Sequence, residues 1–558
     1  MQTHTVFNQS KPLVDYDMFN SDPILQDLVE RYEASWSSPL LSSFGEYAGS
    51  AQAIEWAELA NRNEPVLHNF DRFGNRIDKV EFHPSYHQLM QKSIEFGTHN
   101  LPWTESRSGS QIARAALMYM DFQNEAGHCC PISMTFSVLP SLRKQEDLAS
   151  VWEPLIKSKR YDSRYIPAFD KEGVTVGMAM TEKQGGSDVR ANTTTAAPVA
   201  ESGAGRAYFL TGHKWFCSAP MSDAFLMLAQ TEKGLSCFLV PRFGSDGKLN
   251  HIFVQRLKDK LGNKSNASSE IELDSAIGYL IGEEGRGVPT IIEMVNHTRL
   301  DCIIGASALM RQASLQALHH CKHRSAFGKL LIDQPLMVNV LADLFLESES
   351  ATRLMMRIAA SYEQDVDSEQ ERLFKRIGSA IAKYWVCKRA PAHVAEALEC
   401  FGGNGYVESA PMARLFRESP LLGIWEGSGN VICLDVLRAA AKEPEALDAF
   451  VAELERSSGS SKRIDSQIAI ARENIGWIKK NFAQNNKSGI EQCELSARRV
   501  VEQLAVCLQA SLMCRQSNEL SAEVFANARL ERRNGLAFGT IDCSLAEAQS
   551  IIKKAFSL

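Results

Sequence analysis

The 558-residue sequence lacks the signatures of several protein classes. It has no C-x-x-C pair, and its 13 cysteines are scattered, so reduced thiols fit better than a disulfide framework or a zinc site. No apolar run reaches the roughly 18 residues that a membrane span needs. The opening MQTHTVFNQSKPLVDYD lacks the basic and apolar regions of a signal peptide. We therefore expect a cytoplasmic protein without a bound metal or a membrane partner.

An excess of positive charge is also missing, because the formal net charge is -7. Bulk charge therefore does not favour nucleic acid or an anionic membrane as a partner. The composition, 44% hydrophobic and 23% charged, is ordinary for a globular protein. A chain of this length predicts three or four domains, and we find no internal repeat or low-complexity tract.

The spacing of apolar residues predicts four segments. Residues 1–172 are expected to be helical, because SAQAIEWAELANR and SGSQIARAALMYMDFQNEAG space their apolar residues three and four apart. Residues 173–287 alternate apolar and polar positions between short turns, which predicts a β domain. Residues 288–440 predict a helical bundle, and 441–558 a further helical block. The expected fold class is α+β, mostly α.

Two stretches of the expected β domain carry groups that suit a ligand. In MTEKQGGSDVRANT, two glycines let backbone N–H groups approach a ligand, and Thr181 and Ser187 add hydroxyls. A polar hairpin is the alternative interpretation. In GHKWFCSAP, Trp215 and Phe216 could stack on a flat ring whose edge bonds Ser218. Strand aromatics, however, more often belong to the core.

Two stretches of the expected helical bundle could bind an anion. In HRSAFGKLLIDQP, Arg324 can pair with a phosphate, although a surface arginine near a helix end is a common alternative. In CFGGNGYVES, small residues suit an anion-binding turn, although a helix C-cap also needs glycine. The second stretch is not G-x-G-x-x-G and no βαβ pattern surrounds it, so a Rossmann site is excluded.

The stretch GIWEGSGNVICL combines an acid with a predicted helix start. A helix that begins within 427–429 would favour a phosphate at its N-terminus, with Ser428 and Asn430 as donors. Glu426 precedes it, beside Trp425. In an apolar cleft the pKa of this carboxyl would rise, and such a base can remove a proton from carbon next to a carbonyl. The alternative is an exposed loop acid near a helix start.

Taken together, these stretches resemble the acyl-CoA dehydrogenase family in their order and spacing. Within it, MTEKQGGSDVRANTT, GHKWFCSAPMSDA, LKDKLGNKSNAS and IWEGSGNVICLDVLR are similar to the AidB-like branch, flavoproteins of the bacterial response to DNA alkylation. The resemblance covers nearly the whole chain. It implies a helical domain, a β-barrel-like middle domain, a helical bundle and an extra C-terminal helical domain, in a homotetramer that binds FAD.

The resemblance also implies roles for single residues. Glu426 would be the catalytic base and Arg299 would lie beside the thioester. The residues implied to contact FAD within one subunit are Met180, Thr181, Gly186, Ser187, Phe216, Cys217, Ser218, Trp425, Gly427, Ser428 and Asn430. The residues implied to reach the FAD of a neighbouring subunit are Arg324, Phe327, Gln334, Gly402 and Gly403.

The resemblance leaves three functions open. Phe216 stands where the family usually has tryptophan, Glu399 replaces a frequent glutamine, and Asn296 with His297 replaces Asp-Lys. The first hypothesis is therefore a flavoprotein that binds double-stranded DNA and protects it against alkylation, with weak dehydrogenase activity. The second is an acyl-CoA dehydrogenase for short or branched chains. The third is a non-catalytic flavin scaffold, which would not need Glu426.

Charge alone does not identify a DNA-binding block. Residues 441–558 carry 16 Lys and Arg against 15 Asp and Glu, a net +1, so the preceding residues carry -8. DNA binding would therefore need a local patch. A solvated helix face is the simpler interpretation, and the family resemblance is what favours DNA. The candidates are Arg438, Arg498, Arg499, Arg529, Arg532 and Arg533.

Overall fold

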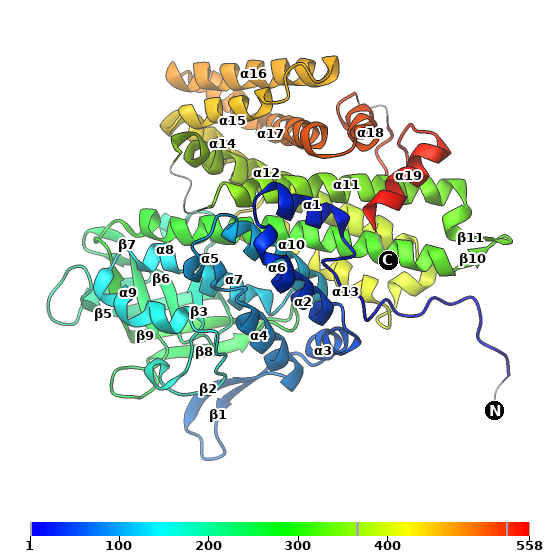
Figure 1. Cartoon of the computed structure of the whole chain (residues 1–558). Coiled ribbons are helices and arrows are strands. Elements are labelled where there is room, and N and C mark those ends of the chain that lie inside the picture. Colours follow the sequence, from blue (N-terminus) through cyan, green and yellow to red (C-terminus); the bar gives the residue numbers. More distant parts are fainter. Residues whose placement is uncertain (1–2, 364–367, 532–533, 557–558) are drawn as a thin grey trace. The chain divides into compact units, whose positions relative to one another are not determined.

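The computed structural model describes residues 3–363, 368–531 and 534–556, which form two compact units (Figure 1). The first comprises Met1–Ser50, Arg107–Gln123 and Cys302–Leu558, and the second Ala51–Ser106 and Asn124–Asp301. The segment 1–172, predicted as one domain, thus contributes to both units. Helices account for 56% and strands for 14% of the structure, which confirms a mostly helical α+β fold.

The centre of the second unit is a closed β-barrel (Figure 1). Strands β6, β4, β5, β9 and β7 follow one another, and β7 pairs with β6 to close the ring. Strand β3 joins β6 in parallel, and β8 joins β9. The strands are β3 (Val176–Ala179), β4 (Thr195–Pro198), β5 (Ala207–Ser218), β6 (Ala224–Thr231), β7 (Gly234–Pro241), β8 (Ile252–Leu257) and β9 (Ser268–Ile281). The barrel confirms the β domain expected from alternating apolar residues.

Helices and one hairpin complete the second unit. The hairpin, β1 (Val66–Phe70) and β2 (Arg76–Glu81), lies between the two predicted helical stretches of segment 1–172, where connections and no strands were expected. Its turn is stabilised by Asp71, whose Oδ1 accepts the N–H groups of Phe73 and Asn75. The helices are α3 (Ala51–Arg62), α4 (Pro84–Phe96), α5 (Leu101–Thr104), α7 (Cys129–Ser137), α8 (Leu139–Leu142) and α9 (Glu146–Ile156), with 3₁₀ turns η2 (Ala168–Asp170) and η3 (Val189–Ala191).

The first unit is helical, and α10 (Gly287–His323) passes from the second unit into it. Its other α-helices are α1 (Pro23–Arg31), α2 (Ser38–Ala48), α6 (Ser110–Asn124), α11 (Pro335–Ala360), α12 (Glu369–Glu399), α13 (Pro411–Glu418), α14 (Gly429–Lys442), α15 (Glu445–Glu455), α16 (Lys462–Ala483), α17 (Lys487–Gln516), α18 (Glu519–Arg529) and α19 (Leu545–Ala555). Short elements are η1 (Ser35–Ser37), β10 (Ser325–Ala326), β11 (Lys329–Leu330), η4 (Leu331–Asp333), η5 (Gly402–Tyr406) and η6 (Leu421–Gly423).

Buried ion pairs tie two helices of the C-terminal block 441–558, α15 and α18, to the long helix α11, which is also paired with α12. Arg357 of α11 donates to Glu453 of α15 and to Glu371 of α12. Burial alone would raise the pKa of Glu453, but the hydrogen bond and charge of Arg357 lower it to about 2. Arg529 of α18 contacts Asp343 and Glu347 of α11 in the same way.

No helix among the described residues is long and apolar enough to span a membrane.

Candidate functional site

Glu426 lies in a loop whose backbone is held by a buried lysine. Its own backbone adopts φ +55°, a left-handed conformation that a residue with a side chain adopts only at a cost. Lys383, on α12 and 1% exposed, donates from Nζ to the carbonyl of Trp425 at 2.9 Å and to that of Gly427. These carbonyls flank Glu426, so the ammonium group fixes the backbone on both sides of this half-buried acid.

The helix predicted to begin within 427–429 begins at Gly429. Ser428 is its N-cap residue, with extended backbone, yet its side chain makes no capping hydrogen bond. The Ser428 hydroxyl is exposed and can bond a ligand instead. Asn430 is exposed as well, and its Oδ1 accepts a hydrogen bond from Arg498 Nε at 2.7 Å. The start of α14 therefore presents polar side chains at the positive end of a helix.

A cavity of about 210 Å³ lies between α12 and the start of α14. Its polar lining includes Lys383 and Lys388, and no acidic residue lines it among the described residues. Gly427 and Gly429 form the other wall. A Cβ on Gly429 would lie 3.4 Å from both a guanidinium nitrogen of Arg498 and a ring carbon of Tyr384. Small residues and cations together make this cavity suited to the phosphates of a ligand.

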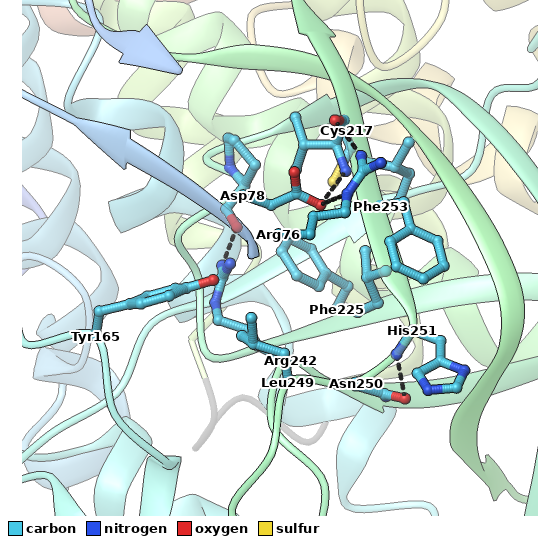
Figure 2. Close-up of a pocket in the computed structure, with 14 residues that line it drawn as sticks. Arg76, Asp78, Tyr165, Cys217, Phe225, Arg242, Leu249, Asn250, His251 and Phe253 are labelled. Atoms are coloured by element: carbon cyan, nitrogen blue, oxygen red, sulfur yellow. Dashed lines mark hydrogen bonds and ion pairs between the residues drawn. The ribbon is translucent and has the colours of Figure 1, made fainter. Parts of the chain in front are cut away.

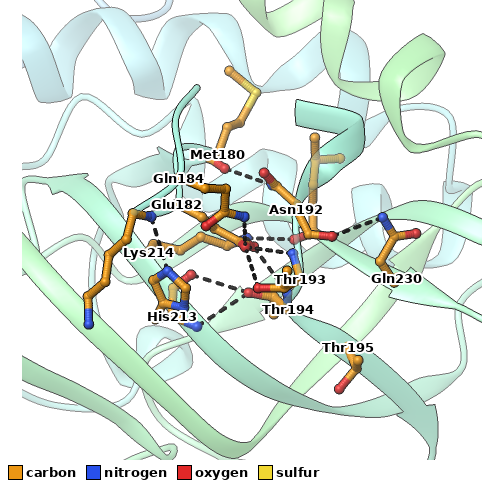
Figure 3. A network of polar contacts seen from close by, with 12 residues as sticks. Met180, Glu182, Gln184, Asn192, Thr193, Thr194, Thr195, His213, Lys214 and Gln230 are labelled. Atoms are coloured by element: carbon orange, nitrogen blue, oxygen red, sulfur yellow. Dashed lines mark hydrogen bonds and ion pairs between the residues drawn. The ribbon is translucent and has the colours of Figure 1, made fainter. Parts of the chain in front are cut away.

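The loop after β3 is fixed by a buried ion pair between Glu182 and Lys214 (Figure 3). Glu182 accepts the backbone N–H groups of Thr193 at 2.7 Å and Thr194 at 3.2 Å, and Lys214 Nζ at 2.8 Å. Lys214 also donates to the carbonyl of Leu228. Burial raises the pKa of Glu182, but the hydrogen bonds of Lys214 and Thr194 outweigh it and lower this pKa to about 2. The loop is thereby fastened to the barrel.

The glycines of this loop leave room for its polar groups. A Cβ on Gly186 would lie 2.4 Å from the hydroxyl oxygen of Thr181, so glycine at 186 lets that hydroxyl keep its position. Gly185 has φ +132°, which favours glycine. Ser187 is exposed, and the carbonyl of Met180 accepts a hydrogen bond from Asn192 at 2.9 Å. Thr181 and Gly186 therefore lie against each other in this loop, and Ser187 beside them is open to solvent; binding of a ligand here stays a prediction.

Strand β5 directs its predicted ligand residues to both sides of the barrel wall. Phe216 is 48% exposed, and the Ser218 hydroxyl lies 3.3 Å from that of Ser268. Cys217 points instead into the interior, where it lines a cavity of about 90 Å³ with Arg242 (Figure 2). The pairing of β5 with β9 shifts register between Lys214 and Cys217. The side chain of Cys217 therefore does not share a surface with those of Phe216 and Ser218.

The hairpin after α10 exposes an aromatic ring. Phe327 is 99% exposed and has φ +52°. Gln334 donates to the carbonyl of Ala326 at 3.0 Å, and Arg324 donates to the carbonyl of Asn8 at 2.6 Å. The FGGNG stretch forms η5, in which Gly402 and Gly403 are exposed and would tolerate a nearby ligand because nothing lies within 4 Å of their Cβ positions.

The predicted DNA-contacting arginines lie in different surroundings. Arg438 and Arg499 are exposed, and neither forms an ion pair with the described residues. Arg529 is mostly buried against Asp343 and Glu347, so its guanidinium is not presented to a phosphate. Arg532 and Arg533 lie outside the described residues. The substrate candidate Arg299 is buried in α10, with 9% of its surface exposed.

Sequence reasoning missed the residues that hold the two loops in place. Lys383 lies 43 positions before Glu426, and Lys214 lies 32 positions after Glu182. Lys383 stands in the otherwise apolar stretch AIAKYWVC, and Lys214 is followed by the apolar residues WFC. A charge within such a stretch is a signal for a buried, partnered lysine. Lys258, whose Nζ lies 3.6 Å from the ring centre of Trp215 and 4.5 Å from that of Phe216, was missed as well.

Three family models match successive parts of the chain. "Adaptive response protein AidB N-terminal domain" matches residues 8–163. "Acyl-CoA dehydrogenase, middle domain" matches residues 177–276, which fall within the β domain. "Acyl-CoA dehydrogenase, C-terminal domain" matches residues 285–441, which include Glu426 and most of α14.

Individual relatives extend over nearly the whole chain. The "Putative acyl-CoA dehydrogenase AidB" of Escherichia coli is 42% identical over 537 residues, 96% of each chain. The crystal structure of Caenorhabditis elegans ACDH-11 in complex with C11-CoA aligns with a TM-score of 0.85 at 26% identity and covers 99% of this chain and 96% of that one. The apo-form of Bd2924 aligns with a TM-score of 0.83 at 29% identity, over 92% and 100%. The chain therefore belongs to the acyl-CoA dehydrogenase family, in its AidB-like branch, and is an FAD-dependent oxidoreductase.

Proposed function

We propose that this flavoprotein oxidises an acyl thioester at adjacent CH groups, with Glu426 as the base, and that it also binds double-stranded DNA in an AidB-type response to alkylation. The observation that carries the first part is the loop of Glu426. A left-handed residue whose two flanking carbonyls bond one buried ammonium group has a fixed direction. A base must be positioned before its pKa matters, so this restraint supports a role in proton removal.

The chain offers groups that fit FAD. At the start of α14, cations and a wall of glycines suit phosphates, and the exposed Ser428 hydroxyl is unused by the helix cap. In the barrel, Gly186 leaves the Thr181 hydroxyl in place, and the exposed Phe216 ring can lie against a flat ring system. We propose these residues, with Met180, Ser187, Ser218, Trp425, Gly427 and Asn430 and the backbone of Cys217, as the FAD contacts of one subunit.

FAD, when bound, supplies the two-electron acceptor that this oxidation requires. The contribution of the chain is to place the carboxylate of Glu426 where it takes the proton from the carbon next to the thioester carbonyl. Arg299 is proposed to contact the same substrate. The relative ACDH-11 was crystallised with C11-CoA, which supports an acyl-CoA as the substrate class.

We propose a homotetramer in which the hairpin after α10 contacts a neighbouring subunit. A phenylalanine that is 99% exposed on a hairpin is apolar surface that a partner would cover. Arg324, Gln334, Gly402 and Gly403 are proposed to contribute to the FAD site of that neighbour.

All 13 cysteines are thiols and 11 of them are buried, which supports a reducing compartment such as the cytoplasm.

An anaerobic titration with a panel of acyl-CoAs tests the proposed oxidation. We expect the flavin absorbance to bleach in the wild-type protein and the bleaching rate to fall by about 10²- to 10⁴-fold in Glu426→Gln, because the amide cannot accept the proton. Glu408→Gln is a matched control, since Glu408 is an exposed acid of the same bundle. A Glu426→Gln protein that bleaches at the wild-type rate would remove Glu426 from the mechanism.

A specific observation favours the second part, DNA binding. Arg438 on α14 and Arg499 on α17 are exposed without ion-pair partners among the described residues, and these helices pack together. Free guanidinium groups of this kind can pair with phosphates. We expect the affinity for duplex DNA to fall as salt rises, and Arg438→Ala to reduce the slope of log affinity against log salt by about 0.9. No binding at low salt would eliminate this part.

A further inference from the structure

We propose that Arg498, which α17 contributes from the C-terminal block, belongs to the FAD site at the start of α14 and not to the DNA-binding surface. The inference rests on the proposed FAD contacts of Ser428 and Asn430. It assigns a cofactor role to a residue outside the three matched family domains, which end at residue 441. It also links the C-terminal block to the redox cofactor.

The contacts of Arg498 carry the assignment. Its Nε donates to Oδ1 of Asn430 at 2.7 Å, which spans 68 positions of sequence. Its Nη2 lies beside Gly429, at 3.4 Å from the position that a Cβ would take there, which is van der Waals contact. The guanidinium group thus lies against the first residues of α14. A side chain that only faced solvent would make no such contact with the residues proposed to hold the cofactor.

The electrostatics of this helix start are incomplete without an anion. The positive end of the α14 dipole meets the charges of Lys383, Lys388 and Arg498. None of these three cations forms an ion pair with a described residue, and Lys383 is 1% exposed. Like charges at the positive end of a helix repel one another, so an anion placed there relieves the repulsion. The diphosphate of FAD supplies two negative charges.

The neighbouring arginine provides the contrast. Arg499 follows Arg498 on α17, and successive residues of a helix point about 100° apart. Both arginines are exposed, but Arg499 makes no polar contact with the described residues, whereas Arg498 is bonded to Asn430. Two adjacent arginines of identical chemistry therefore have different assignments, with Arg498 at the cofactor and Arg499 at the proposed DNA surface.

One consequence is thermodynamic linkage. A ligand that contacts both α14 and α17 stabilises the packing of these helices in proportion to its occupancy. We therefore expect FAD to protect α17 against hydrogen exchange in addition to the loop around Glu426. The C-terminal block of the apoprotein would open more readily than that of the holoprotein.

Reconstitution of the apoprotein with FAD tests the assignment. We expect Arg498→Ala to raise the Kd for FAD at least 10-fold, as measured by quenching of flavin fluorescence, and Arg499→Ala to change it less than 2-fold. Riboflavin, which lacks the phosphates, should bind Arg498→Ala and the wild type equally. Arg498→Lys keeps the charge and should recover part of the affinity. Duplex DNA binding should show the reverse order, with the salt slope reduced in Arg499→Ala only.

The outcomes separate this inference from the broader proposal. If the wild type binds FAD and Arg498→Ala binds it equally well, Arg498 has no cofactor role. If Arg498→Ala instead loses DNA affinity as Arg499→Ala does, Arg498 belongs to the DNA surface. If the wild-type apoprotein does not bind FAD at all, the proposed cofactor contacts fail as a whole. Should Arg498→Ala misfold by circular dichroism, Arg498→Gln gives the same comparison, with a side chain that keeps a donor to Asn430 but no charge.

Discussion

Two loops of this protein are each held by a buried lysine, but only one of the two lysines has a carboxylate partner that neutralises its charge. In the barrel, Lys214 meets the carboxylate of Glu182 at 2.8 Å, so the loop 181–194 rests on a neutral pair. In the helical unit, Lys383 donates to two backbone carbonyls and has no carboxylate partner among the described residues. The first loop is electrostatically complete in the chain itself, whereas the second retains a positive charge.

The difference shows how each loop is prepared for its ligand. A buried ion pair with no net charge fixes the conformation of its loop but does not attract a charged ligand, which suits a surface that contacts a flat, uncharged ring. An ammonium group that bonds only to carbonyls also fixes the conformation of its loop, and its uncompensated positive charge attracts an anion. We therefore expect loss of Lys214 to be felt mainly as lost stability, and loss of Lys383 mainly as lost cofactor affinity.

The largest expected effect comes from breaking the barrel pair. Lys214→Met leaves the Glu182 carboxylate buried without its cation and should lower the free energy of unfolding of the barrel by about 3–5 kcal/mol. The double variant Lys214→Met/Glu182→Leu removes both charges and should recover most of that loss. Urea denaturation followed by tryptophan fluorescence measures both. Equal losses in the single and double variants would show that the pair contributes packing and not charge compensation.

Acid should reveal the same pair in the unmodified protein. The pKa of Glu182 is lowered from 4.5 to about 2, so the stability that its ionised form contributes is present above pH 4.5 and is lost as the pH falls toward 2. Thermal unfolding measured from pH 5 to pH 2 should therefore lose stability in this window. Glu182→Gln should show a shallower dependence over the same range, and an identical dependence would contradict the assignment.

Removal of Lys383 should have a smaller effect on stability. Lys383→Met deprives two carbonyls of their donor, which costs about 1–3 kcal/mol, but it also removes a buried charge. The net loss in urea denaturation is expected to be below that of Lys214→Met, while the Kd for FAD rises. Lys388→Met, at an exposed position lining the same cavity, is the control for charge without the carbonyl contacts. A stability loss equal to that of Lys214→Met would refute the distinction between the loops.

The smallest effect is expected at Ser428. Replacing an N-cap serine by alanine ordinarily costs about 1 kcal/mol, because a capping hydrogen bond is lost. Ser428 makes no such bond, so Ser428→Ala should change the unfolding free energy by less than about 0.5 kcal/mol. FAD affinity, measured by fluorescence titration, should nevertheless fall. Ser544→Ala, which breaks the capping box of α19, is the comparison that should show the ordinary cost.

The periodicities of the sequence predicted the β domain and the long helices because these patterns are regular and long enough, whereas the barrel form was implied by the family resemblance. The sequence did not predict the β1–β2 hairpin, whose strands are short and depend on the Asp71 turn. The ligand-facing stretches were visible as glycines and hydroxyls beside aromatic or acidic residues. The supports Lys214 and Lys383 were not, because they act over 32 and 43 positions. Pairings of this range arise from tertiary packing and leave no local pattern.

The prediction for strand β5 shows the same limit at closer range. Simple alternation would place Phe216 and Ser218 on the face opposite Cys217, as observed, but it would also place Trp215 with Cys217. The register shift between Lys214 and Cys217 turns Trp215 outward to meet Lys258. A bulge of this kind depends on the partner strand and cannot be predicted from the residues of β5 alone.

The closure of β7 onto β6 has a consequence for handling this protein. Open strand edges recruit other chains into intermolecular sheets. Here the ring is sealed, and the two strands at its edges, β3 and β8, each have a donor already engaged. The Val176 N–H of β3 donates to the Thr135 hydroxyl of α7, and the Val254 N–H of β8 donates to the Asp78 carboxylate of β2. Preparations that have lost the cofactor should therefore remain free of fibrillar aggregates as long as the β-barrel stays folded.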